Sequence, residues 1–239
     1  KSNPSTFLGF YSNIREIFAS TPESKIKGLT AKHFSFNLKD GRCSECEGQG
    51  QIKVEMQFLP DVFTECRACH GKRFSQKVLN IKFKNLDISQ VLNLTVDEAI
   101  NVFKNHNKIY AHLSMMKKIG LGYLKLGQPS NTISGGEAQR LKISKELAKK
   151  TKGKTLYILD EPSTGLHFSD INHLVTCIDE IKKLGHTCII IEHNPILIKK
   201  ADYIIDMGPG GGRFGGKVLY QGPINKINKS KPSIIKKYI

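Results

Sequence analysis

Apolar residues form two runs near the C-terminal end, separated by a stretch with helical spacing. The runs are residues 155–160 and 187–192, and the stretch between them is 168–184. Strands of a parallel sheet read as nearly continuous apolar runs because helices cover both faces. The order therefore predicts a right-handed βαβ unit with two buried parallel strands. The helix should bury one face, made of Ile171, Leu174, Val175, Ile178 and Ile181.

Further helices are expected N-terminal to this unit. One should cover residues 11–20 and end at Thr21-Pro22. Thr95 and Glu98 have the spacing of a capping box that opens a second helix. A third should follow Ser134. Chain pattern and motifs divide the sequence into residues 1–33, 34–127 and 128–239, of which the last is α/β.

The chain is strongly basic. Its 239 residues include 37 Lys and Arg against 21 Asp and Glu, which gives a net charge of +16. Such a surface attracts polyanions, above all nucleic acid. The lysines are spread along the chain, so compositional bias is an equally good interpretation. No apolar run approaches the ~20 residues of a membrane span. The polar start, Lys1-Ser2-Asn3-Pro4, is no signal peptide and lacks Met, so we expect a fragment of a longer cytoplasmic protein.

Four cysteines form two C-x-x-C pairs, Cys43 with Cys46 and Cys66 with Cys69. Pairs at this separation supply four thiolates to a tetrahedral Zn²⁺, and four protein ligands leave no place for a catalytic water. We therefore predict a structural zinc module over about residues 41–73, with glycines where the backbone turns toward sulfur. Four unrelated thiols or a redox motif fit the paired spacing less well. Cys177 and Cys188, which stand alone, are expected to be core thiols.

Acidic residues and a histidine follow the two apolar runs. Asp160 and Glu161 end the first run, and His193 follows the second. Ligands of α/β proteins bind at the carboxyl ends of strands. Asp160 is suited to hold Mg²⁺ and Glu161 to polarise a water. His193 is interpreted as a phosphate sensor, although a lone histidine is often structural.

The segment Ser134-Gly135-Gly136-Glu137 opens the helix expected after Ser134. Its spacing is that of a plain capping box, but the two glycines also bare backbone N–H groups that a phosphate can approach. A string with Walker A spacing, residues 211–217, is rejected. It is followed by Val218, which has no hydroxyl for Mg²⁺, and by a strand pattern rather than a helix.

The order SGGEAQR, ILDEPSTGLH, IIIEHN resembles the ATP-binding cassette ATPases, and most closely the C-terminal half of the UvrA family of DNA-repair ATPases. Nearly the whole chain, from about residue 2 to 223, is similar to that family. Further similar segments are residues 2–4, 41–43, 55–62, 69–73, 120–123 and 126–129.

The resemblance implies a role for each motif. Ser134, Gly135, Gly136, Glu137 and Gln139 would belong to the signature motif that contacts ATP. Asp160 would be the Walker B aspartate and Mg²⁺ ligand, Glu161 the catalytic base and His193 the switch histidine. Ser163 and Gly165 would lie in the D-loop.

The resemblance also implies an architecture and partners. The fold class would be an α/β core of the P-loop ATPase type that lacks its N-terminal part. Residues 1–33 would be a remnant of the cassette, 34–127 an inserted signature subdomain with the zinc module, and 128–239 the nucleotide-binding core. Family members form homodimers, bind damaged duplex DNA, hand it to UvrB and hydrolyse ATP in the cytoplasm, without a membrane partner.

Two alternatives stay open. The first is a UvrA-like paralogue that serves drug resistance, which would share every motif. The second is a zinc-dependent binding module, because the first cysteine pair with Gly48 and Gly50 resembles a zinc repeat of DnaJ-type chaperones. The second pair departs from that repeat, with Arg73 in the place of glycine. Because Walker A is missing, the chain by itself is expected to hydrolyse no ATP.

Overall fold

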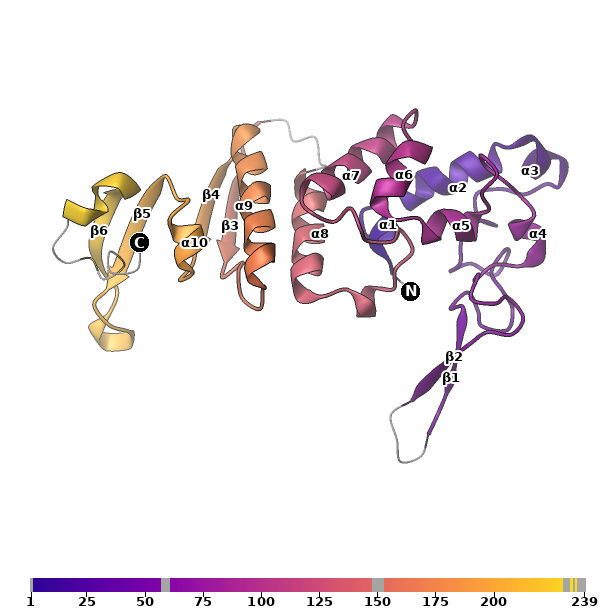
Figure 1. Cartoon of the computed structure of the whole chain (residues 1–239), viewed down its shortest axis with the longest axis horizontal. Helices are drawn as coiled ribbons and strands as arrows, with labels where there is room; N and C mark the ends of the chain where they lie inside the picture. The colour runs from indigo at the N-terminus through magenta and orange to yellow at the C-terminus, as the bar shows by residue number, and fades with distance from the viewer. Residues whose placement is uncertain (1, 57–60, 148–152, 230–232, 234, 236–239) are drawn as a thin grey trace. The chain divides into compact units, whose positions relative to one another are not determined.

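The computed structural model describes residues 2–56, 61–147, 153–229, 233 and 235. The chain forms two compact units, Lys1–Lys149 and Lys150–Ile239, and each is described by itself. Figure 1 gives the order of the elements along the chain. Among the described residues, no helix is both long and apolar enough to span a membrane.

The first unit is mainly helical. Its helices are α1 (Pro4–Phe7), α2 (Tyr11–Ala19), α3 (Pro22–Ile26), α4 (Gln76–Leu79), α5 (Ile88–Asn93), α6 (Val96–Val102), α7 (Asn107–Lys118), η1 (Ser130–Thr132) and α8 (Gly135–Leu147). Their shared core is rich in phenylalanine side chains that are almost fully buried. These are Phe10, Phe18, Phe34, Phe36, Phe74 and Phe103. Burial of rings of this size is the main source of stability in such a unit.

Two of the expected helices are confirmed. The helix expected over residues 11–20 is α2, and Thr21 caps the next helix by accepting the Ser24 N–H. Thr95 and Glu98 form the expected capping box of α6, with both reciprocal hydrogen bonds present. Capping satisfies backbone donors that have no partner inside the helix.

A hairpin of β1 (Gln51–Val54) and β2 (Val62–Glu65) extends from the first unit (Figure 1). The strands pair antiparallel, with Gln51 opposite Glu65 and Val54 opposite Val62. Residues 57–60, which lie between the two strands in the sequence, are outside the described residues. Every residue of both strands is exposed, so the hairpin has no core of its own.

The second unit contains the predicted βαβ arrangement. Strand β3 (Leu156–Asp160) leads to helix α9 (Phe168–Lys183) and then to β4 (Thr187–Ile191). The two strands pair parallel, with Leu156 opposite Thr187 and Asp160 opposite Ile191. Helix α10 (Pro195–Ile198) and an antiparallel pair, β5 (Tyr203–Gly208) and β6 (Lys217–Pro223), follow. The short helices η2 (Gly212–Phe214) and η3 (Ile224–Lys229) complete the unit.

The prediction that β3 and β4 are buried on both faces is wrong for this chain. Leu156, Ile158, Ile189 and Ile191 are 55%, 66%, 51% and 54% exposed. Side chains of a strand alternate between faces, and α9 packs against β4. The expected helix face is present, with Leu174 and Ile181 almost fully buried. The apolar runs therefore predicted the positions of β3 and β4 correctly. They did not predict that, among the described residues, only one face of these strands is covered.

The same substitution should have very different effects in the buried face of α9 and on the exposed face of β3. Ile181→Thr places a hydroxyl in the core and removes apolar contact, so it should lower the free energy of unfolding by on the order of 2 to 4 kcal/mol. Ile158→Thr alters a side chain that is 66% exposed and keeps β-branching, so its effect should stay within about 0.5 kcal/mol. Urea unfolding followed by circular dichroism measures both. Equal destabilisation by the two variants would contradict the one-sided burial of this sheet.

Candidate functional site

The four paired cysteines converge on one point. Their Sγ atoms all lie within 4.8 Å of one another, and all four residues are buried. Cys43 and Cys66 sulfurs are 3.9 Å apart, and those of Cys46 and Cys69 are 3.6 Å apart. Ligands at the Zn–S distance of about 2.3 Å place tetrahedral sulfurs roughly 3.8 Å from one another. The donor set and its spacing therefore fit Zn²⁺.

Each cysteine pair is followed by the same backbone turn. Glu47 and Gly48 have φ of 50° and 78°, and His70 and Gly71 have 46° and 71°. In the first turn the Gly50 N–H donates to Cys46 Sγ at 3.2 Å. A Cβ on Gly48 would lie 2.0 Å from the Phe36 carbonyl oxygen, so only glycine fits there. The expected turning of backbone N–H groups toward sulfur is present in this turn. We call each cysteine pair with the turn that follows it a knuckle.

Arg73 takes the place of glycine in the second knuckle. Its φ of 71° matches the 78° of Gly50, and its backbone N–H bonds to the sulfur of Cys69. A non-glycine residue in this region is strained. The side chain makes compensating contacts, because its guanidinium lies over the Phe36 ring at 5.3 Å and donates to the Gly127 carbonyl. Arg73 thus joins the knuckle to the helical core.

Protons compete with a metal for these thiols. Burial raises the pKa of Cys69 to about 12. Burial also acts to raise the pKa of Cys46, but hydrogen bonds, chiefly from the Gly50 N–H, outweigh it and lower that pKa. Thiolates are the ligands, so metal binding releases protons and weakens as the pH falls.

Two of the basic residues beside the cluster have acidic partners within the chain. Arg42 pairs with Glu47 at 2.6 Å. Lys53 pairs with Glu55 at 3.2 Å and with Asp61 at 2.8 Å. These pairs reduce the charge that the hairpin and first knuckle present to a polyanion.

Ser134 and Glu137 form the capping box that their spacing predicts. The Ser134 N–H donates to Glu137 Oε2 at 2.7 Å, and the Glu137 N–H donates to Ser134 Oγ at 3.3 Å. Tyr123 Oη also donates to Glu137 Oε1 at 2.6 Å. Burial acts to raise the pKa of Glu137, but these bonds outweigh it and lower the pKa.

The space around this helix start is open at the first glycine. Apart from the adjoining backbone, no atom of the described residues lies within 4 Å of the position that a Cβ on Gly135 would take, whereas Gly136 is buried. Gln139 is half-buried one turn further along α8. The capping geometry is thus present. Contact of Gly135, Gly136 or Gln139 with a phosphate stays a prediction.

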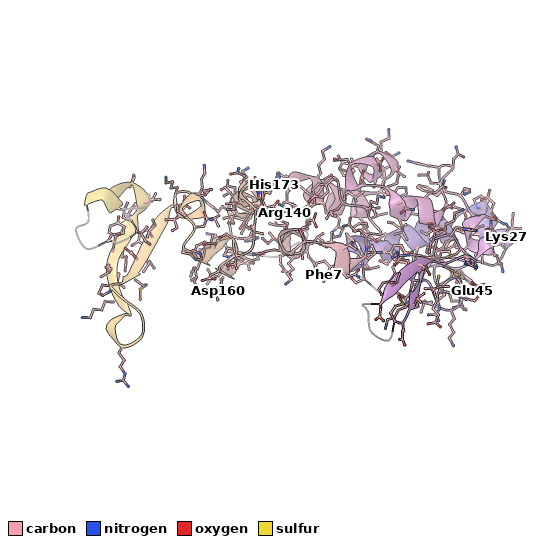
Figure 2. The ribbon with its side chains drawn as sticks, turned by 60° about the horizontal axis from the view of Figure 1, so that its bottom comes forward. Phe7, Lys27, Glu45, Arg140, Asp160 and His173 are labelled. Carbon is pink, nitrogen blue, oxygen red and sulfur yellow. The ribbon has the colours of Figure 1, made fainter. Side chains whose placement is uncertain are left out.

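The parallel pairing of β3 and β4 places the other predicted residues at one sheet edge. Asp160 ends β3 opposite Ile191, the last residue of β4 (Asp160 is labelled in Figure 2). The pairing continues one residue further, because the Glu161 N–H donates to the Ile191 carbonyl at 2.9 Å. His193 Nδ1 then lies 3.8 Å from Glu161 Oε1, with both side chains largely exposed. The predicted base and the predicted histidine are neighbours.

The loop after β3 is a tight turn. Glu161 has a φ of 42°, and the Thr164 N–H donates to its carbonyl at 3.0 Å. The Thr164 hydroxyl also donates to Glu161 Oε2 at 3.2 Å. Ser163 is buried, and Gly165 has a φ of 74°. A left-handed glutamate is uncommon and is typical of residues held for function.

Sequence reasoning missed Glu192, which is the last residue of the apolar run 187–192 and directly precedes His193. Its side chain is 4% exposed, and its carboxylate accepts N–H groups from Ser163, His193 and Asn194. Burial acts to raise the pKa of Glu192, but hydrogen bonds from the Ser163 side chain and from the three N–H groups outweigh it and lower the pKa. The signal in the sequence that could have identified Glu192 was an acidic residue at the end of an apolar strand.

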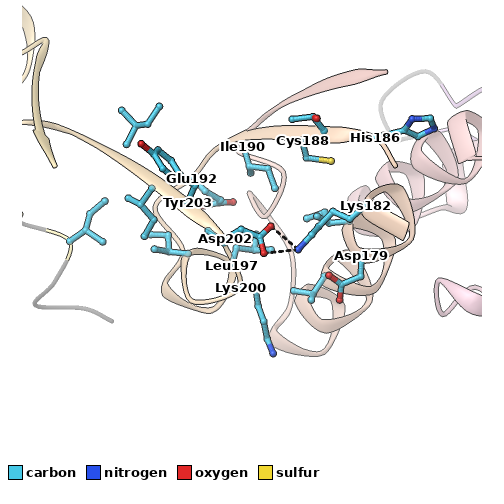
Figure 3. Close-up of a pocket in the computed structure, with 18 residues that line it drawn as sticks. Asp179, Lys182, His186, Cys188, Ile190, Glu192, Leu197, Lys200, Asp202 and Tyr203 are labelled. Atoms are coloured by element: carbon cyan, nitrogen blue, oxygen red, sulfur yellow. Dashed lines mark hydrogen bonds and ion pairs between the residues drawn. The ribbon is translucent and has the colours of Figure 1, made fainter. Parts of the chain in front are cut away.

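A pocket of about 500 Å³ lies in the second unit between α9, β4, α10 and β5 (Figure 3). Lys182 and Asp202 form an ion pair of 2.8 Å in it, and Glu192 and Cys188 also line it. Cys188 is only half-buried, whereas Cys177 is buried as expected. Asp160, Glu161 and His193 are not among the lining residues.

The rejected string at residues 211–217 has the structure that its sequence indicates. It contains the short helix η2, and β6 begins at Lys217. A phosphate-binding loop is followed by a helix, whose N-terminus faces the phosphate. The region therefore lacks the local structure of a Walker A loop.

Comparison with known proteins gives one consistent result. No protein-family model matches the chain. It is 50% identical over 239 residues to the UvrABC system protein A of Clostridium tetani, which covers 100% of this chain and 25% of that protein. The UvrABC system protein A of Helicobacter pylori is 52% identical over 222 residues, 93% of this chain and 24% of that protein.

A solved structure agrees with these sequences. The crystal structure of UvrA2 from Deinococcus radiodurans matches with a TM-score of 0.89 and 40% identity, over 99% of this chain and 28% of that chain. The match confirms the expected fold class. The chain spans about a quarter of the length of the curated relatives that it matches.

Zinc content tests the metal centre. Because one Zn²⁺ takes four cysteines, the purified chain should contain about one zinc per molecule. Cys66→Ser removes a fully buried ligand and should reduce the zinc content severalfold. Cys188→Ser, outside the cluster, should leave it unchanged. Elemental analysis by mass spectrometry gives these contents. Full zinc content in Cys66→Ser would contradict the four-cysteine site.

Proposed function

The chain belongs to the UvrA family along its whole length, and from this premise we propose that it is a nucleotide-binding part of a UvrA-type DNA-repair ATPase. The observation that carries the proposal is the edge formed by β3 and β4, where Glu161 and His193 lie 3.8 Å apart beside Asp160. The buried four-cysteine cluster supports a UvrA-type assignment over an ordinary cassette ATPase.

The proposed chemistry is hydrolysis of ATP by a positioned water. Asp160 would hold Mg²⁺, and Glu161 would accept a proton from the attacking water or orient it. His193 would hydrogen-bond the terminal phosphate. Ser134, Gly135, Gly136, Glu137 and Gln139, with Ser163 and Gly165, would contact the nucleotide. The Walker A lysine and its loop would come from sequence that is not in this chain.

The zinc module is proposed to be structural. Cys43, Cys46, Cys66 and Cys69 would fill the coordination sphere of Zn²⁺, which leaves no place for a reacting water. Bound zinc would hold the exposed hairpin to the helical core.

For the whole protein we propose the partners that the resemblance to the UvrA family implies. We propose binding of damaged duplex DNA, transfer to UvrB and a homodimer in the cytoplasm, with ATP binding and hydrolysis driving the cycle. The net charge of +16 supports contact with nucleic acid. Restoration of ultraviolet resistance in a repair-deficient strain by the full-length gene would support repair. Failure to restore it, combined with full ATPase activity, would favour a resistance paralogue.

Glu161→Gln in the full-length protein should lower the ATP turnover number by about 10²-fold or more, because a general base contributes that much. ATP binding should persist, because the amide keeps the shape of the side chain. Glu23→Gln on the exposed surface of α3 is the matched control and should retain full turnover. Steady-state hydrolysis and equilibrium ATP binding measure the two effects. Unchanged turnover in Glu161→Gln would remove this residue as the base.

The isolated chain should hydrolyse ATP no faster than buffer. It carries no Walker A loop to hold the phosphates, while its zinc content should be normal. Phosphate release by the purified chain is the measurement. Turnover comparable with that of the full-length protein, retained after Glu161→Gln, would mean that a different site performs hydrolysis.

A further inference from the structure

We propose that Glu192 is a positioning residue, which fixes Glu161 relative to His193 by joining the two loops that carry them. The inference rests on the proposed ATPase function of this sheet edge. It adds a residue to which neither the motif order nor the resemblance assigns a role.

The carboxylate of Glu192 uses its two oxygens for two different loops. Oε1 accepts the N–H of Ser163, in the loop after β3, at 3.0 Å. Oε2 accepts the N–H groups of His193 and Asn194, in the loop after β4, at 2.6 and 2.8 Å. The side chain is 4% exposed, so water competes little for these bonds.

Among the described residues, few other polar contacts join the two loops. The Glu161 N–H bonds to the carbonyl of Ile191 and ends the strand ladder. The contact of His193 with Glu161 is 3.8 Å long and exposed, which is too weak to fix either side chain. The bonds to Glu192 therefore extend the link beyond the ends of both strands.

The hydrogen bonds of Glu192 hold backbone segments that determine where the Glu161 and His193 side chains lie. Ser163 lies inside the turn that Glu161 opens with its φ of 42° and that Thr164 closes. On the other loop, Glu192 holds the N–H of His193 itself. It also holds Asn194, whose side chain caps α10 by accepting the Ile196 N–H at 2.9 Å. Movement of either loop must stretch a bond to the same carboxylate.

An anion is the group that this position requires. Three N–H donors and the Ser163 side chain converge on two oxygens, and a buried carboxylate is tolerated only when hydrogen bonds replace its water. The amide of a glutamine has one acceptor oxygen. Whichever way that amide is oriented, its NH₂ group must face either the Ser163 N–H or the pair from His193 and Asn194. Glu192→Gln therefore removes at least one of these N–H bonds and weakens the link between the loops while it preserves the volume.

Loss of the link should affect the chemical step more than ATP binding. Glu192 is not expected to touch the nucleotide, but the separation of Glu161 and His193 would become variable. A misplacement of about 1 Å in a catalytic group can cost roughly 10²-fold in rate. We expect Glu192→Gln to lower kcat by about 10- to 100-fold and to change KM for ATP less than about threefold.

The experiment uses the full-length protein with Glu192→Gln and a matched control, Glu180→Gln. Glu180 is also a buried carboxylate, on α9, where it pairs with Lys183 at 2.9 Å. Steady-state kinetics give kcat and KM. Amide hydrogen exchange is followed in peptides that contain Ser163, His193 and Asn194. Exchange there should accelerate in Glu192→Gln and stay at the wild-type rate in Glu180→Gln.

Each outcome decides the inference. Unchanged exchange in Glu192→Gln would overturn the link, whatever the kinetics. Faster exchange with unchanged kcat, while Glu161→Gln is inactive, would overturn the positioning role and leave the proposed function standing. An unaffected kcat in Glu161→Gln would overturn the proposed function itself. If Glu192→Gln does not fold, Glu192→Asp gives the same two readouts, because it keeps the charge but is too short to hold both loops.

Discussion

The parallel register of β3 and β4 is the constraint on which the candidate nucleotide site depends. With Asp160 opposite Ile191, the residues that follow each strand leave the sheet at the same edge. A shift by one residue would turn every side chain to the opposite face and would separate Glu161 from His193. Helix α9 packs its apolar face against β4, so one face of the strand pair is buried. Burial of a single face specifies the register. Packing remote from the edge thus sets the geometry of the edge.

The hairpin of the first unit depends on a different interaction. Its strands are exposed throughout, and an isolated hairpin is at best marginally stable in water. The four sulfurs at its base supply what a core does not, because metal binding contributes folding free energy directly. Arg73 accepts an unfavourable backbone conformation there, and its contacts with Phe36 and Gly127 hold the knuckle against the helices.

Features encoded over short distances could be predicted from the sequence. Ser134 with Glu137, and Thr95 with Glu98, form capping boxes because both partners lie within one helical turn. The cysteine cluster could be predicted because two C-x-x-C pairs at this separation are typical of a tetrahedral zinc site. The order of strand, helix and strand gave the parallel pair. In each case the residues that determine the feature are close enough in the sequence to form a recognisable pattern.

Features that need distant partners could not be predicted. An apolar run predicts a strand, but the sequence does not say whether this chain covers both faces of it, and Ile158 is 66% exposed. The link made by Glu192 depends on Ser163, which is far away in the sequence and comes close only through the parallel register. The left-handed Arg73 is tolerated only because Phe36 and Gly127 meet its side chain. Tertiary contacts decide all three.

We propose that this chain supplies nucleotide-contacting residues to a longer ATPase. Photo-crosslinking of the full-length protein with an ATP derivative that carries an aryl azide attached to its terminal phosphate tests this proposal most directly. Peptide mapping should find the label on segments that contain His193 or Glu161, or Ser134 to Glu137. Excess unmodified ATP should abolish the label. Labelling that excludes all of these segments, under conditions in which the protein hydrolyses ATP, would contradict the claim.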